Sequence, residues 1–355
     1  MQKKTAVVAG ATGVIGSYIA RHLSKLEGWD VIGIARHIPD DPSDITYVSA
    51  DMMDGQNVQE NLESFSEVTH FIYAAYQDYE SDPQKQVEVN QTMFENTLNA
   101  VEKNADHLER VILMQGAKAY GVHLGPIKTP AKETDARHMP PNFYFTQEDY
   151  MRRAQEGKDW SWTILRPDVV CGYSVGKPMN LAMVIGAYAS ISKELGLPLR
   201  FPGKAHPYLA QVTDATLLAQ CVEWAAVEES CAFEIFNVTN GDYFRWEHMW
   251  KTIADYFDME AAGAEPPIQL SEMMADKQEL WEQMKEKYHL QDIPYDKLAL
   301  WGFGDFIFNC DYDVMTSTTK LREYGFHEFV DSEEMFTRLF REFQQEGVLP
   351  DFSNQ

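Results

Sequence analysis

Three glycines near the start of the chain have the spacing of a dinucleotide-binding loop. Gly10, Gly13 and Gly16 follow a short apolar run and open a segment with helical spacing. The first glycine permits a sharp turn, the second lets the backbone approach a pyrophosphate, and the third lets helix and strand pack closely. The free N–H groups at the start of the helix then face the phosphates. Alone this pattern is weak evidence, but the strand before it and the helix after it favour a dinucleotide site over an ordinary turn.

The end of the second predicted strand indicates which dinucleotide binds. Enzymes that use NAD usually place Asp or Glu there to bond the 2′-hydroxyl of the ribose. This chain has Arg36 and His37 instead, and a guanidinium matches the 2′-phosphate of NADP with two parallel hydrogen bonds. We therefore expect NADPH as the cofactor, the alternative being that Arg36 is a solvated surface side chain. Asp51 and Met52 follow the third predicted strand, where an acidic residue commonly contacts the adenine amine.

A tyrosine is the best candidate for the catalytic group. Reductases that bind a dinucleotide at such a glycine loop commonly carry a Tyr and, four residues later on the same helix, a Lys that lowers the pKa of the phenol. A match at Tyr173 and Lys177 is rejected, because the surrounding glycines and proline predict a loop. Tyr144 lies where the catalytic helix of this fold begins, but the residue four positions later is Glu148. The positive charge that lowers the pKa of the phenol must then come from another part of the chain. Lys118, after the fifth strand, either points into the site or is an ordinary solvated loop lysine.

Alternating strand-like and helix-like segments must position these residues. The predicted strands are residues 5–9, 30–35, 45–49, 70–74, 110–114 and 162–166. The predicted helices among them are residues 17–26, residues 87–102 and a helix from about Thr146. Continuous apolar strands that alternate with helices predict a parallel sheet covered on both faces. The fold class is therefore α/β, a doubly wound Rossmann sheet whose ligands bind at the carboxyl ends of the strands.

The second half of the chain has a different character. It is rich in Trp, Met and Phe and contains long stretches with helical spacing, at residues 179–195, 215–228, 246–257, 271–288 and 332–346. We expect an NADP-binding domain at residues 1–175 and a mostly helical substrate-binding region at residues 176–355. The second region packs on the first, either as a separate part or as one structural unit with it.

Composition limits the classes of function. The net charge of −25 over 355 residues repels phosphate backbones and anionic lipid, which disfavours nucleic-acid and membrane-surface roles. The four cysteines show neither CxxC spacing nor clustering with His, so we expect no metal site, no disulfide framework and a reducing, cytoplasmic location. No stretch approaches the roughly 20 apolar residues of a membrane helix. A homodimer is the default expectation for the assembly.

These features together resemble one family, the progesterone 5β-reductase/iridoid synthase-like enone reductases, which are atypical extended short-chain dehydrogenases/reductases. The resemblance covers almost the whole chain. The displaced lysine and the Asn-Phe-Tyr block that precedes Glu148-Asp149 are specific to this family, whereas the glycine loop is not. The matching segments are residues 10–16, 34–37, 49–51, 68–71, 116–121, 142–149, 166–167 and 236–242.

The resemblance implies a reaction and the residues that perform it. The matching Tyr and Lys are catalytic in the family, which implies Tyr144 and Lys118 here. NADPH would deliver hydride to the β-carbon of a small apolar α,β-unsaturated carbonyl compound. Tyr144 would then donate a hydrogen bond to the developing enolate oxygen, supported by the charge of Lys118. The implied cofactor contacts are Thr12, Gly13, Val14, Arg36, His37, Asp51, Met52, Ala75, Met114, Tyr144 and Val170.

The chain also departs from the family, and other functions stay open. The family often has a second Tyr at the position of Phe145, an Arg at the position of His37 and a Trp at the position of Tyr76. We therefore do not expect this chain to share the family's specificity for steroids or iridoid precursors. One alternative is a carbonyl reductase, and another is a nucleotide-sugar epimerase or dehydratase, which normally keeps the Lys that Glu148 replaces. A third alternative is a non-catalytic NADP-sensing regulator, against which the retained Tyr144 argues.

Overall fold

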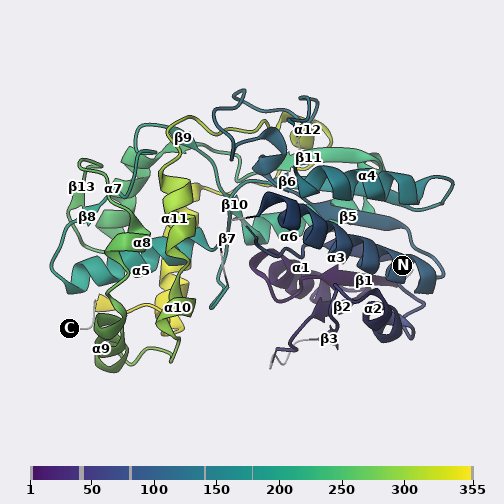
Figure 1. Ribbon diagram of the computed structural model, residues 1–355, viewed down its shortest axis with the longest axis horizontal. Coiled ribbons are helices and arrows are strands. Elements are labelled where there is room, and N and C mark those ends of the chain that lie inside the picture. Colours follow the sequence, from purple (N-terminus) through teal and green to yellow (C-terminus); the bar gives the residue numbers. More distant parts are fainter. Residues whose placement is uncertain (1–2, 40–43, 80–81, 140, 178, 353–355) are drawn as a thin grey trace.

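A parallel sheet forms the centre of the part of the molecule that contains the N-terminus (Figure 1). The computed structural model describes residues 3–39, 44–79, 82–139, 141–177 and 179–352. The sheet has seven strands in the order β11-β6-β5-β4-β1-β2-β3, and all neighbours run parallel. Its strands are β1 (Lys4–Ala9), β2 (Trp29–Ala35), β3 (Ile45–Ser49), β4 (His70–Tyr73), β5 (Arg110–Met114), β6 (Ser161–Pro167) and β11 (Glu234–Val238).

Helices cover both faces of this sheet, as the continuous apolar strands predict. One face packs against α1 (Val14–Ser24) and α6 (Ala215–Val227). The other face packs against α2 (Gly55–Leu62), α3 (Pro83–Asn104) and α4 (Phe143–Gln155). The predicted Rossmann fold is therefore confirmed.

Helices also dominate the other side of the molecule, where they gather around α5 in Figure 1. α5 is buried along nearly its whole length and forms the centre of a second apolar core. The helices of this region are α5 (Leu181–Glu194), α7 (Trp246–Tyr256), α8 (Leu270–Met273), α9 (Gln278–Tyr288), α10 (Tyr295–Leu298), α11 (Trp301–Phe308) and α13 (Ser332–Gln345). Within the described residues, no helix combines the length and apolarity needed to cross a membrane.

Short elements complete the fold. A five-residue helix, α12 (Thr319–Glu323), packs against β11. The two-residue strands are β7 (Val170–Cys171), β8 (Leu199–Arg200), β9 (Leu209–Ala210), β10 (Thr213–Asp214), β12 (Phe244–Arg245) and β13 (Ala261–Ala262). The 3-10 helices are η1 (Ala117–Tyr120) and η2 (Glu229–Cys231).

The structure corrects two details of the sequence prediction. The seventh strand, β11, comes from the second half of the chain and was not predicted; α6 likewise comes from beyond residue 175. The division of the chain into two regions at residue 175 stays a prediction. The single helix predicted at 271–288 is two helices, because the chain turns at Met274, whose carbonyl oxygen accepts a hydrogen bond from Tyr295 Oη (2.6 Å).

Candidate active site

A cavity of about 740 Å³ lies between the sheet and the helical region. One wall is built from residues that follow β1, β2, β3, β4, β5 and β6, so it lies at the carboxyl edge of the sheet, where doubly wound folds bind ligands. The opposite wall comes from the second half of the chain and is largely apolar, with side chains such as Leu181, Trp246, Phe303, Phe306 and Ile307. The volume of the cavity is typical of a small-molecule site.

The glycine loop forms a close-packed cradle at this edge. Gly10 has φ +80°, a conformation that favours glycine, and a Cβ there would approach Ala75 to 2.9 Å. A Cβ on Gly16 would meet the carbonyl oxygen of Gly10 at 2.2 Å, so this glycine lets α1 pack on the loop. Gly13 precedes α1 and supplies no side chain to cap it. The loop therefore leaves room and free N–H groups for the pyrophosphate of a dinucleotide.

The structure brings most of the predicted cofactor residues to the cavity wall. Two do not line it: Gly16 packs behind the loop, and the exposed His37 lies beyond Arg36. The roles of all of them stay predictions. The predicted residues that line the cavity are Gly10, Thr12, Gly13, Val14, Arg36, Asp51, Met52, Ala75, Met114, Tyr144 and Val170.

Tyr144 lies in the first turn of α4 and lines the cavity. The helix begins at Phe143, three residues before the predicted start, because the side chain of Asn142 accepts a hydrogen bond from the N–H of Tyr144 (2.9 Å) and caps it. A Cβ on Gly116 would lie 3.1 Å from Tyr144 Oη, so the glycine leaves space for the phenol. Burial raises the pKa of Tyr144, which Arg166 opposes in part, so the hydroxyl is protonated at neutral pH.

Lys118 also lines the cavity, from η1 directly after β5. Its backbone carbonyl is held in place by Asn142, whose Nδ2 donates to it (2.9 Å), and by Nε2 of His138 (3.1 Å). Asn142 thus fixes both Lys118 and Tyr144. The ammonium lies 5.5 Å from the centre of the Phe306 ring on the opposite wall. The positive charge of Arg166 lowers the pKa of Tyr144.

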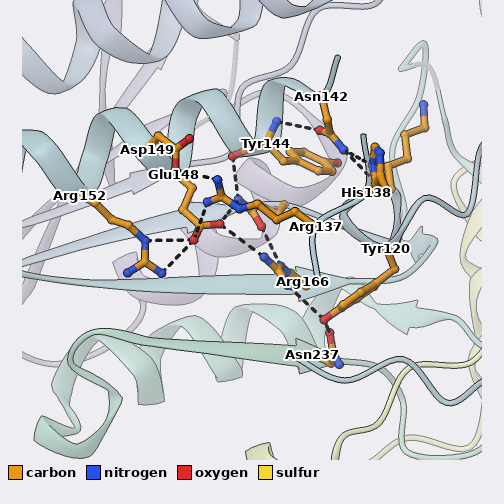
Figure 2. Close-up of polar contacts among 12 residues, drawn as sticks. Tyr120, Arg137, His138, Asn142, Tyr144, Glu148, Asp149, Arg152, Arg166 and Asn237 are labelled. Atoms are coloured by element: carbon orange, nitrogen blue, oxygen red, sulfur yellow. Dashed lines mark hydrogen bonds and ion pairs between the residues drawn. The ribbon is translucent and has the colours of Figure 1, made fainter. Parts of the chain in front are cut away.

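Glu148 takes the place of the usual lysine and is the centre of an ion-pair network (Figure 2). Its carboxylate pairs with Arg137 (3.0 Å), Arg152 (2.8 Å) and Arg166 (3.4 Å). The Glu148 and Arg166 side chains are only 4% and 5% exposed. Gln115 connects this network to the backbone of Tyr144, because it accepts from Arg166 Nε (2.8 Å) and donates to the carbonyl oxygen of Tyr144 (3.0 Å).

Some cavity residues lie outside the sequence predictions. Asp168, Gln211 and Cys310 are polar groups of the wall that no motif singled out. The position of Asp168 directly after the sixth strand was a usable signal, since that edge binds ligands. Tyr173 and Lys177 share no helix, as expected, but Lys177 does line the cavity.

Comparisons with known proteins agree with this architecture. The PRISE-like Rossmann-fold domain matches residues 44–350. The 3-oxo-Delta(4,5)-steroid 5-beta-reductase of Arabidopsis thaliana is 32% identical, covering 98% of this chain and 94% of that protein. The (S)-8-oxocitronellyl enol synthase of Catharanthus roseus is 30% identical, covering 98% and 93%.

A solved structure shows the same fold at lower identity. The UDP-glucose 4-epimerase of Thermus thermophilus, in complex with NAD, superposes with a TM-score of 0.67 at 18% identity, over 95% of this chain and 99% of that one. This likeness establishes the fold, and the two relatives establish the family. The chain therefore belongs to the PRISE-like Rossmann-fold family, as an oxidoreductase of the short-chain dehydrogenase/reductase type.

Proposed function

We propose that the protein reduces the C=C bond of α,β-unsaturated carbonyl compounds with NADPH. The observation that carries the proposal is a protonated Tyr144 hydroxyl in the wall of a largely apolar cavity, with Glu148 where a ketone-reducing or epimerising enzyme keeps a lysine. The names of the two relatives, a steroid 5-beta-reductase and an enol synthase, support the same class of reaction.

The residues of this chain have separate tasks in the reaction. A nicotinamide cofactor held at the glycine loop would supply the hydride that adds to the β-carbon of the substrate. Negative charge then collects on the carbonyl oxygen as an enolate, and Tyr144 Oη donates a hydrogen bond to it. Lys118 contributes a positive charge to the same cavity, and the apolar wall with Trp246 and Phe303 accommodates the carbon skeleton of the substrate. A proton from solvent at the α-carbon completes the saturated ketone.

A product assay tests the proposal directly. Purified protein is mixed with NADPH and 2-cyclohexen-1-one, oxidation is followed at 340 nm, and the product is identified by mass spectrometry and NMR. Cyclohexanone is the expected product. An allylic alcohol would instead indicate a carbonyl reductase, and tight NADPH binding without turnover of any enone would favour the regulator. A cytoplasmic location and a homodimer remain predictions from the sequence.

The preference for NADPH is assigned to Arg36, the first residue after β2. It is exposed and lines the cavity, where its guanidinium can pair with the 2′-phosphate. Arg36→Ala is expected to raise the KM for NADPH about 10- to 100-fold, the value of a hydrogen bond to a charged group, and to leave the KM for NADH nearly unchanged. Lys25→Ala removes an exposed cation outside the cavity and is the matched control. Equal losses for both cofactors in Arg36→Ala would contradict the assignment.

A further inference from the structure

His138 contacts the segments that carry both proposed catalytic residues. Its Nε2 lies 3.1 Å from the carbonyl oxygen of Lys118 and 3.0 Å from Nδ2 of Asn142. The Asn142 side chain caps the helix of Tyr144, because its Oδ1 accepts a hydrogen bond from the Tyr144 N–H (2.9 Å). Figure 2 shows the imidazole beside this capping side chain. One ring therefore adjoins the backbone of Lys118 and the residue that fixes the start of α4.

The partners of this imidazole determine which hydrogen bonds it can make. Nδ1 faces the carbonyl oxygen of Met139 (2.8 Å), which only accepts, so Nδ1 carries a hydrogen. Nε2 faces one group of each kind, because Asn142 Nδ2 only donates and the carbonyl oxygen of Lys118 only accepts. A neutral imidazole therefore accepts a hydrogen bond from Asn142, whereas an imidazolium donates one to Lys118.

The neutral imidazole leaves the Asn142 amide fully hydrogen-bonded. The two hydrogens of Nδ2 reach the carbonyl oxygen of Lys118 (2.9 Å) and Nε2 of His138 (3.0 Å), while Oδ1 accepts from the Tyr144 N–H. An imidazolium turns its own hydrogen toward Nδ2, so that one N–H of Asn142 loses its acceptor. Protonation of His138 is therefore expected to loosen the amide that fixes both Lys118 and the first turn of α4.

A second histidine packs against this ring but does not titrate with it. The rings of His123 and His138 have centroids 5.4 Å apart. Burial, assisted by the nearby Lys118 and His138, lowers the pKa of His123 to about 4. His123 thus stays neutral over the range in which imidazoles ordinarily titrate, roughly pH 5 to 8.

The remaining charged groups around His138 lie on its own segment and on α4. The preceding residue, Arg137, pairs with Glu148 (3.0 Å) and Asp149 (2.7 Å) of α4. The other ring in contact with the imidazole is that of Phe145 (5.0 Å), which carries no charge. A change of protonation in this cluster near neutral pH is therefore expected at His138.

We propose that His138 is a positioning residue whose neutral imidazole, through Asn142, holds Lys118 and Tyr144 in place, and whose protonation slows the reaction. This inference rests on the proposed function, since the rate concerned is that of enone reduction. His138 itself does not line the cavity, so it acts on the reaction only through the residues that it holds. The structure thereby assigns a pH response to a site whose tyrosine is protonated at neutral pH.

The kinetic test compares pH profiles. The kcat for 2-cyclohexen-1-one is measured at saturating NADPH from about pH 5.5 to pH 8.5. Wild-type kcat should fall about 3- to 10-fold toward low pH, the value of one neutral hydrogen bond. In His138→Gln, an oxygen that cannot be protonated can accept from Asn142, so most of the high-pH rate should remain and the fall should disappear. His138→Leu offers no acceptor and should be about 3- to 10-fold slower than wild type at pH 8.

Two comparisons assign the effect to this imidazole. His248→Gln removes a 74% exposed imidazole outside the cavity and should keep the wild-type profile. Asp168 also lines the cavity, and burial raises its pKa to about 6. Because Asp168 is present in every variant, its titration leaves the difference between the wild-type and His138→Gln profiles unchanged.

Hydrogen exchange without substrate separates this inference from the proposed function. Exchange of residues 117–121 and 143–147 is followed by mass spectrometry in the NADP⁺-loaded protein at about pH 6 and pH 8 and corrected for intrinsic rates. Wild type should lose protection at the lower pH, His138→Gln should keep it, and His138→Leu should lack it at both.

The outcomes distinguish the two proposals. If this exchange pattern holds but no enone is reduced, the reductase proposal fails and the control of Asn142 by His138 stands. If enones are reduced with the same pH profile in wild type and His138→Gln, the role of His138 fails and the reductase proposal stands. Faster exchange in His138→Leu with an unchanged kcat would show a purely structural role and overturn the inference.

Discussion

Tyr144→Phe is expected to lower kcat for enone reduction by about 10²- to 10³-fold, the usual cost of losing one hydrogen bond to a developing oxyanion. The substitution removes only the hydroxyl that faces the space beside Gly116. Because burial raises the pKa of this phenol, the wild-type group is a protonated donor at neutral pH. Steady-state kinetics at saturating NADPH measures the loss, and quenching of protein fluorescence by NADPH checks that the cofactor still binds.

A second tyrosine on the same helix provides the matched control. Tyr150 lies on α4, and its hydroxyl donates to Oδ1 of Asn99 (2.6 Å) outside the cavity. Tyr150→Phe removes the same atom from the same helix, so kcat should stay within about twofold of wild type, as for a substitution away from the site. A rate in Tyr144→Phe equal to that of Tyr150→Phe would rule out Tyr144 as the hydrogen-bond donor to the enolate.

Glu148→Ala is expected to destabilise the fold by about 3–5 kcal/mol, the usual result of removing one partner of a buried ion pair. The Arg166 side chain, which is 5% exposed, would keep its charge without a carboxylate beside it. Arg137 and Arg152 are 37% and 44% exposed, so they can turn to solvent. Urea denaturation followed by circular dichroism measures the change in the free energy of unfolding.

The neighbouring carboxylate serves as the comparison. Asp149 is 48% exposed and pairs with Arg137 (2.7 Å), so Asp149→Ala should cost no more than about 1 kcal/mol. The double variant Glu148→Leu/Arg166→Met removes both buried charges and should regain part of the lost stability. Equal destabilisation by Glu148→Ala and Asp149→Ala would show that the buried Glu148–Arg166 pair contributes no more to the free energy of unfolding than an exposed ion pair.

The sequence was sufficient for most elements of the sheet because their periodicity is local. Strands β3 and β5 have the predicted bounds, and the glycine loop after β1 leads into a helix as its spacing requires, although α1 begins at Val14, three residues before the predicted start. The start of α4 was misplaced by three residues, since the cap depends on the side-chain rotamer of Asn142 and not on apolar spacing. The strand β11 was missed because its five residues include Glu234 and Asn237 and therefore lack a continuous apolar run.

The chemistry of the site was predictable only in part. The sequence shows that position 148 lacks the lysine, but not that three arginines from a loop, a helix and a strand surround Glu148. Likewise, Asp168 is recognisable as an edge residue, whereas the burial of its Oδ2, which has no hydrogen-bond partner among the described residues, depends on how the folded chain surrounds it. Contacts between distant segments decide both cases, and no local pattern encodes them.

The late position of β11 and α6 in the chain has a consequence for biosynthesis. When β6 has left the ribosome, its outer edge lacks the neighbour that β11 will provide, and the sheet face under α6 is still bare. At roughly 5 to 20 residues per second, several seconds pass before residue 238 emerges. During that interval the nascent sheet exposes an open strand edge, the feature that promotes aggregation. The enzyme is therefore expected to depend on chaperones more during translation than after release.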